Sequence, residues 1–199
     1  MARTSSTPDP ARRNERSRQA ILTAAAELAT ELGYAKLTIE AIAARAGVGK
    51  QTIYRWWPSK GAVVFDAFLA ANENEAGSLD LPDTGDLAAD LRALLRPAAE
   101  QLADPAFERV GRAISAEIQL DPTLLREYRA RLLGPLLEVT RDRLRSAQRA
   151  GQLAEDLDLD LAVDLVYGPL HYRWLLGTGP IDQAYADAMV EALLRALRP

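Results

Sequence analysis

The sequence predicts an all-α protein. Apolar residues recur at helical spacing from about residue 14 to the C-terminus, and no segment alternates as a strand does. Helix-start signals recur along the chain, among them Asp-Pro at 104–105 and 121–122, where Asp caps a helix and Pro takes its first position. With 199 residues, 48% of them hydrophobic, the chain can bury a helical core.

The chain begins with a predicted arm and a predicted helix. Residues 1–13 are rich in Ser, Thr, Pro and Arg, which predicts a disordered basic arm. Its arginines suit contact with DNA phosphates or a minor groove, and they suit a solubilising tail equally well. From about Asn14 a helix is predicted that ends at Gly33; its apolar stripe consists of Ile21, Leu22, Ala25, Leu28, Ala29 and Leu32.

A helix, a glycine turn and a second helix follow. Thr38 offers a hydroxyl N-cap to a helix that ends at Gly47. A second helix is predicted from Lys50 to about Trp57, because Pro58 disfavours helical geometry at the residue before it. Its polar side carries Lys50, Gln51, Tyr54 and Arg55, and its apolar side carries Ile53, Trp56 and Trp57. This pattern is typical of a helix-turn-helix, whose second helix enters a DNA major groove.

The remaining chain is predicted to be helical as well. Helices are expected at about 60–74, 86–102, 104–119, 121–150, 159–177 and 181–197, with a turn-rich loop at 76–85. Gly134-Pro135 should kink or split the helix of residues 121–150. Arg141, Arg143, Arg145 and Arg149 on that helix are expected to form a solvated face in ion pairs. The helix at 159–177 is apolar almost all round, so it must be covered on two sides.

Charge is distributed unevenly along the chain. The net charge is −4, yet residues 1–60 hold 10 Lys and Arg against 5 Asp and Glu, while residues 61–199 hold 14 against 23. This asymmetry favours a basic DNA-contacting domain at 14–60 and an acidic body at 61–199. Chance clustering of solvated charge explains the counts as well.

Several classes of function lack their residues. The chain has no cysteine and one histidine, His171, which excludes a thiolate metal site, a His-based metal cluster and a conventional Ser-His-Asp triad. Asp156, Asp158 and Asp160 alternate with leucine before a helix, which favours capping over metal binding. We therefore expect no enzyme, cofactor or metal. Without a membrane-length apolar run or a signal core, a cytoplasmic protein is expected.

Residues 15–65 resemble the N-terminal domain of the tetracycline-repressor (TetR) family of bacterial transcriptional regulators. The resemblance is carried by ELGYAKLT and by Gly47-Val48-x-Lys50-x-Thr52-Ile53-Tyr54-x-Trp56-Trp57-x-Ser59-Lys60. The C-terminal half resembles the family's regulatory domain more loosely, through DLAVDLVYGPLHYRWLLGTGP and the closing amphipathic helix. The resemblance implies nine helices, three in a DNA-binding domain and six in a domain that dimerises and usually holds a small-molecule pocket.

The resemblance also implies roles for single residues. Lys50 and Gln51 would meet base edges, and Trp56 would lie close to the DNA backbone. Phosphate contacts would come from Thr38, Thr52, Tyr54 and Lys60. Arg55 occupies a variable position of the family and is our choice for a guanine reader, because arginine can donate to guanine O6 and N7. Gly49 departs from the family, in which a hydroxyl residue often caps the recognition helix.

Two further sets of residues are assigned to the C-terminal domain. Aromatic side chains that could line an apolar effector pocket, or simply pack in the core, are Phe68, Phe107, Tyr128, Tyr167 and Trp174. The resemblance also implies a dimer interface along the last two helices, for which the candidate residues are Val163, Tyr167, His171, Trp174, Tyr185, Met189 and Leu193.

Together these observations predict a ligand-responsive repressor that acts as a homodimer on a palindromic DNA operator. Its expected partners are double-stranded DNA, a second copy of itself and a small apolar effector. The alternative is an all-helical small-molecule binding protein or enzyme that does not bind DNA. A regulator of this fold without any effector is a third possibility.

Overall fold

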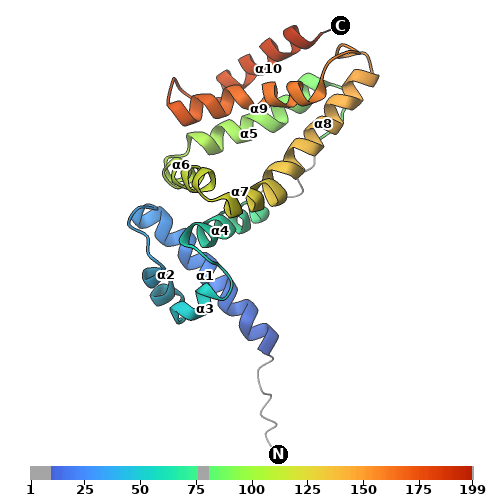
Figure 1. Ribbon diagram of the computed structural model, residues 1–199. Helices are drawn as coiled ribbons and strands as arrows, with labels where there is room; N and C mark the ends of the chain where they lie inside the picture. The colour runs from blue at the N-terminus through green and yellow to red at the C-terminus, as the bar shows by residue number, and fades with distance from the viewer. Residues whose placement is uncertain (1–9, 76–80, 199) are drawn as a thin grey trace, which may run out of the picture. The chain divides into compact units, whose positions relative to one another are not determined.

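The structure is a computed structural model that describes residues 10–75 and 81–198. The described residues form helices without a strand, which confirms the all-α prediction (Figure 1). The helices are α1 (Pro10–Leu32), α2 (Ile39–Ala46), α3 (Lys50–Tyr54), α4 (Lys60–Glu75), α5 (Leu87–Ala103), α6 (Pro105–Leu120), α7 (Pro122–Tyr128), the π-helix η1 (Arg129–Leu133), α8 (Gly134–Arg149), α9 (Leu159–Leu176) and α10 (Gln183–Leu197). If α7, η1 and α8 are counted as one interrupted helix, the described ranges hold nine helices, as predicted.

Helix α1 begins earlier than the sequence pattern indicated. It starts at Pro10, whereas the predicted start is Asn14. A proline fits the first position of a helix because its ring fixes a helical φ and its missing N–H would have no partner there. The predicted arm of residues 1–13 is therefore helical from residue 10, and residues 1–9 lie outside the described part. Residues 76–80 of the predicted loop also lie outside it.

The chain forms two compact units. The first contains α1 to α4 together with Ala113–Leu120 of α6, and the second contains the remaining helices together with residues 105–112 of α6. Helix α4 is grouped with the first unit because it packs along α1. The domain boundary between residues 60 and 61 stays a prediction.

The first unit is built on α1, which packs against both α2 and α4. Ile21, Leu22 and Ala25 of its apolar stripe are buried, whereas Leu32, the last member of that stripe, is 44% exposed. The segment after α3 is fixed by Trp57, whose indole N–H donates to a carboxylate oxygen of Asp66 on α4 at 2.8 Å. The orientation of the short helix α3 is thus tied to the longer helices.

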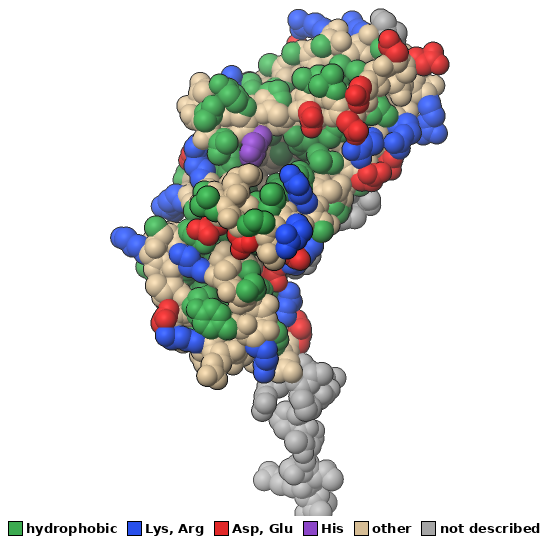
Figure 2. All heavy atoms as spheres, in the orientation of Figure 1, with side chains coloured by type: hydrophobic (Ala, Val, Ile, Leu, Met, Phe, Trp, Pro, Cys, Tyr) green, Lys and Arg blue, Asp and Glu red, His purple; other side chains and the backbone are tan. Residues whose placement is uncertain are grey.

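The second unit has its own apolar core. Helix α9 packs against α8 and α10 and also touches α5, so this largely apolar helix is covered on several sides, while one apolar side of it stays exposed. The core side chains are Leu87, Leu91, Leu95, Ala99, Leu144, Ala147, Leu153, Ala162, Val163, Val166, Leu170, Ala186, Val190, Leu193 and Leu197. Hydrophobic side chains also reach the surface where α9 and α10 run (Figure 2).

One predicted surface arginine is in fact buried. Arg143 is 4% exposed, and its Nε donates to Asp90, which is 1% exposed, at 2.7 Å. Burial raises the pKa of Asp90, but hydrogen bonds from Thr84 and Arg143 outweigh that effect and leave the pKa below its usual value. The prediction of a solvated arginine face is therefore wrong for Arg143, while Arg141 pairs with Asp160 as expected.

The helix break at Gly134-Pro135 takes the form of a π-helix. The N–H of Gly134 bonds to the carbonyl of Arg129, five residues earlier, just before Pro135, which has no N–H to donate. A Cβ on Gly134 would lie 2.7 Å from the Arg129 carbonyl oxygen. The glycine therefore permits the π-turn that separates α7 from α8.

Candidate nucleic-acid interface

Helix α2 and the turn after it are capped at both ends. The hydroxyl of Thr38 accepts a hydrogen bond from the Ala41 N–H at 3.1 Å, which satisfies one free N–H at the start of α2. Gly47 ends the helix with φ of 66°, a left-handed conformation that glycine adopts without strain. Gly49 precedes α3 and supplies no side-chain cap. The chain is thereby turned sharply into α3.

Helix α3 is shorter than predicted. It ends at Tyr54 instead of Trp57, because the next turn tightens: the N–H groups of Trp56 and Trp57 both bond to the carbonyl of Ile53, at 2.9 and 3.0 Å. Ile53 and Trp57 are buried and Trp56 is half-buried. The side of α3 that was predicted to dock on the other helices therefore does so.

The opposite side of α3 faces solvent. Lys50, Gln51, Tyr54 and Arg55 are exposed, and Thr52 is half-buried. Long hydrogen-bonding side chains thus project from a helix whose other side is held in a core. This is the arrangement that a groove-reading helix requires.

The two cations of this exposed side differ in their partners. The ammonium of Lys50 donates to a carboxylate oxygen of Glu40 on α2 at 2.5 Å. That hydrogen bond lowers the pKa of Glu40, and a backbone hydrogen bond and the positive charge of Lys50 lower it further. The guanidinium of Arg55 lies 5.2 Å from the ring centroid of Trp56, and no carboxylate of the described chain pairs with it. The contact between Glu40 and Lys50 had no signal in the sequence, because the two residues lie on different helices.

Lys60 starts α4 and is anchored on the connection between α1 and α2. Its ammonium donates to the carbonyl of Tyr34 at 2.9 Å and lies 4.1 Å from the centroid of the Tyr34 ring. Burial is the main cause that raises the pKa of the Tyr34 hydroxyl, and the nearby charge of Glu117 adds to it. The phenol therefore stays neutral and the charge of Lys60 is not cancelled by it.

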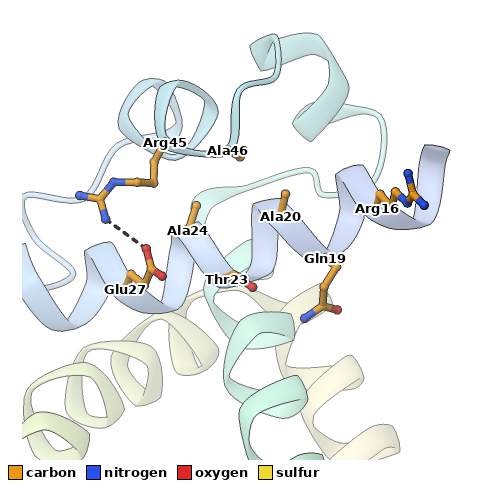
Figure 3. A pocket seen from close by; sticks show the side chains of 8 residues that line it. All are labelled: Arg16, Gln19, Ala20, Thr23, Ala24, Glu27, Arg45 and Ala46. Atoms are coloured by element: carbon orange, nitrogen blue, oxygen red, sulfur yellow. Dashed lines mark hydrogen bonds and ion pairs between the residues drawn. The ribbon is translucent and has the colours of Figure 1, made fainter. Parts of the chain in front are cut away.

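An open hollow of about 450 Å³, with mixed polar and apolar lining, lies between α1 and α2 (Figure 3). Its lining residues are Arg16, Gln19, Ala20, Thr23, Ala24, Glu27, Arg45 and Ala46. Arg45 closes one end, where it bonds to Glu27 at 3.1 Å and to Glu31 at 2.9 Å. None of the residues predicted to bind an effector lines this hollow.

The structure brings together only some of the predicted effector residues. The rings of Phe107 on α6 and Trp174 on α9 lie 6.3 Å apart. The hydroxyl of Tyr167 lies 2.6 Å from that of Thr140, so it is held by α8. Tyr128 is half-buried, and burial raises its pKa. Phe68 belongs to the first unit, whereas the other four residues belong to the second.

The predicted interface residues divide into two groups. Val163, Trp174 and Leu193 are buried within the chain itself, at 2%, 4% and 9% exposure. His171 is exposed, and Tyr167, Tyr185 and Met189 are half-buried. The exposed side of α9 instead carries a stripe at helical spacing, hereafter the α9 stripe, which consists of Leu161, Leu165, Gly168, Tyr172, Leu175 and Leu176.

Asp158 and Asp160 have structural partners. Asp158 caps α9 by accepting from the N–H groups of Asp160 and Leu161, and Asp160 pairs with Arg141 at 2.6 Å. Within the described residues no three or more His, Cys, Asp or Glu side chains are grouped to hold a metal ion. None of the described helices is long and apolar enough to cross a membrane.

The chain is similar over nearly its whole length to known proteins. Residues 21–67 match the family model "Bacterial regulatory proteins, tetR family", and residues 81–193 match "Tetracyclin repressor-like, C-terminal domain". The uncharacterized HTH-type transcriptional regulator YdeS of Bacillus subtilis is 36% identical over 181 residues, which cover 89% of this chain and 88% of that protein. The DNA-binding transcriptional repressor TetR of Mycobacteroides abscessus is 31% identical, over 94% of this chain and 97% of that protein.

A solved structure gives the same result for the fold. The crystal structure of the TetR family transcription regulator SCO0332 superimposes with a TM-score of 0.73 at 36% sequence identity. The match covers 92% of this chain and 99% of that one.

Proposed function

The chain belongs to the tetR family of bacterial regulatory proteins, and from that premise we propose that it is a ligand-responsive repressor that binds a palindromic operator as a homodimer. Family membership makes it a transcriptional regulator with a helix-turn-helix DNA-binding domain. The observation that carries the proposal is the division of α3 into a buried apolar side and an exposed side with Lys50, Gln51 and Arg55. The named repressor that is 31% identical supports repression.

The exposed side of α3 has the chemistry of a major-groove reader. Arg55 and Lys50 can donate to guanine O6 and N7, and Gln51 can bind adenine through two hydrogen bonds. Thr38, Tyr54 and Lys60 supply hydroxyl and ammonium donors for phosphate oxygens, which fix register without reading sequence. Arg55 is the strongest candidate for a guanine reader, since its guanidinium is exposed and stacks on Trp56.

Dimerisation supplies the second reading helix. One five-residue helix reaches few base pairs, so specificity requires a second copy about one helical turn away. The α9 stripe supports such an interface, because several large apolar side chains there are 38–59% exposed. Helix α10 adds an exposed row of small residues at helical spacing: Ala184, Ala188, Ala192 and Ala196. A second copy that covers the α9 stripe and the alanine row of α10 would bury the apolar surface that a lone chain leaves in water.

A ligand would act through the second unit. Phe107 and Trp174 bring two aromatic rings together on different helices, and we propose that an apolar effector binds beside them. An effector releases the operator only if it binds the DNA-free arrangement more tightly than the DNA-bound one. The strength of induction then measures that difference in affinity.

Selection of genomic fragments by the purified protein tests this function. Fragments that include the chain's own upstream region should be enriched, and their binding should weaken steeply as salt rises. Sedimentation should give two chains for each operator, and apolar compounds that raise the melting temperature should release the DNA. Absence of salt-sensitive binding to any genomic fragment would contradict the proposal and favour a small-molecule binding protein.

A further inference from the structure

We infer that Glu40 is a specificity-determining residue that makes Lys50 read base edges and keeps it from binding phosphate. The inference rests on the proposed DNA-reading role of α3. It starts from the contact between the two side chains, which joins the beginning of α2 to the first residue of α3 at 2.5 Å. Both side chains are more than half exposed, so the pair lies on the surface that DNA would cover.

The ammonium of Lys50 can serve Glu40 and a base at the same time. An ammonium group has three N–H donors, and the contact with Glu40 uses one of them. Guanine presents two acceptors in the major groove, O6 and N7, which match the two donors that remain. Glu40 therefore restrains the ammonium without preventing base contact.

A phosphate meets a different environment at the same place. Guanine O6 and N7 are neutral acceptors, whereas a phosphate carries a full negative charge and is repelled by the neighbouring carboxylate. Lys50 beside Glu40 thus contributes little to the charge attraction on which binding to random sequences depends. Other cations of the interface have no such carboxylate: within the described chain, Arg55 stacks on Trp56 and Lys60 bonds to a backbone carbonyl.

The chain provides a matched control for this idea. Glu31 is 51% exposed at its side chain, against 59% for Glu40, and it also pairs with a cation, Arg45, at 2.9 Å. Arg45 lies on α2 and retains Glu27 as a second partner. Replacing Glu31 by Gln removes one negative charge from the same unit and leaves Lys50 and Glu40 in contact.

The experiment compares operator and random duplexes across a salt series for the wild-type protein, E40Q and E31Q. For E40Q, binding to random DNA should strengthen at least about fivefold at low salt, and its salt slope should steepen by about 0.9 for each new phosphate contact. Operator affinity should change less, so the ratio of operator to random affinity falls. E31Q should change the affinities for operator and random DNA by one common factor, which is smaller than the effect of E40Q on random DNA.

A double variant shows whether Glu40 acts through Lys50. In a K50Q background the additional E40Q substitution should leave the salt slope on random DNA unchanged. Melting curves of all variants confirm that they are folded, as expected for exposed side chains. If the wild-type protein binds DNA but E40Q keeps its specificity ratio, or if the E40Q effect persists with K50Q, the role of Glu40 is refuted. Failure of the wild-type protein to bind DNA would instead refute the proposed function.

Discussion

Replacing Leu161 by Asp tests the proposed dimer at the α9 stripe. Leu161 is 55% exposed in the single chain, so a partner that covers it would bury about half of its surface. Full burial of a leucine stabilises by roughly 1.5–3 kcal/mol, which gives roughly 0.8–1.6 kcal/mol for the exposed half. A symmetric dimer contains the residue twice, so the loss is roughly 1.6–3.2 kcal/mol, or about 15- to 200-fold in the dimer dissociation constant.

Sedimentation velocity over a concentration series measures this loss. Leu120 on α6 is the matched control, because it is 80% exposed and lies outside α9 and α10. L161D should dissociate at concentrations at which the wild-type protein and L120D remain dimeric, and it should lose operator affinity in parallel. Equal dimer dissociation constants for L161D and the wild-type protein would show that the α9 stripe is not the interface. The same conclusion would follow if L120D weakened the dimer as much as L161D does.

Four further substitutions test DNA reading and the fold. Arg55→Ala should cost roughly 1–3 kcal/mol of binding free energy on the operator and relax specificity at one base pair. Lys60→Ala should instead weaken binding to operator and random DNA alike and flatten the salt slope by about 1. Titrations with both duplexes distinguish the two roles. Asp90→Asn breaks a buried ion pair, which costs about 3–5 kcal/mol of unfolding free energy at neutral pH in denaturant titrations. Because the pKa of Asp90 is lowered in the folded protein, its ionised carboxylate contributes fully to stability above its unfolded pKa of about 3.9, and this contribution is lost as the pH falls further. The difference in unfolding free energy between Asp90→Asn and the wild-type protein should therefore narrow in acid. Gly134→Ala should lower the melting temperature despite the helix preference of alanine, because the added Cβ would lie 2.7 Å from the Arg129 carbonyl oxygen. A higher melting temperature for Gly134→Ala would show that this close contact does not destabilise the fold.

The helix pattern of this chain could be predicted because its start and stop signals are local. Thr38 caps α2 and Asp121 caps α7 as the sequence indicated, and both caps act on N–H groups within three residues. The end of α3 was less predictable. Pro58 limits the helix but does not determine whether the preceding turn is regular, and here that turn tightens onto Ile53.

Other features depend on contacts between residues far apart in the chain. Arg143 is one of four similar arginines on a long helix, and its burial follows from Asp90, 53 residues away. Helix α9 is apolar on nearly every side, so its sequence does not tell which side meets the core and which side remains free. Val163, a predicted interface residue, accordingly lies in the core, whereas the exposed leucines of α9 are not among the residues that the sequence pattern indicates.

The central claim is that the exposed side of α3 determines which DNA sequence is bound. Binding-site selection from a random duplex library, run in parallel for the wild-type protein and for K50A/Q51A/R55A, tests it most directly. The triple variant keeps Ile53 and Trp57 and should remain folded and dimeric. The wild-type protein should select one consensus with two-fold symmetry, and the variant should select none. Recovery of the same consensus by the triple variant would show that another part of the molecule reads the DNA.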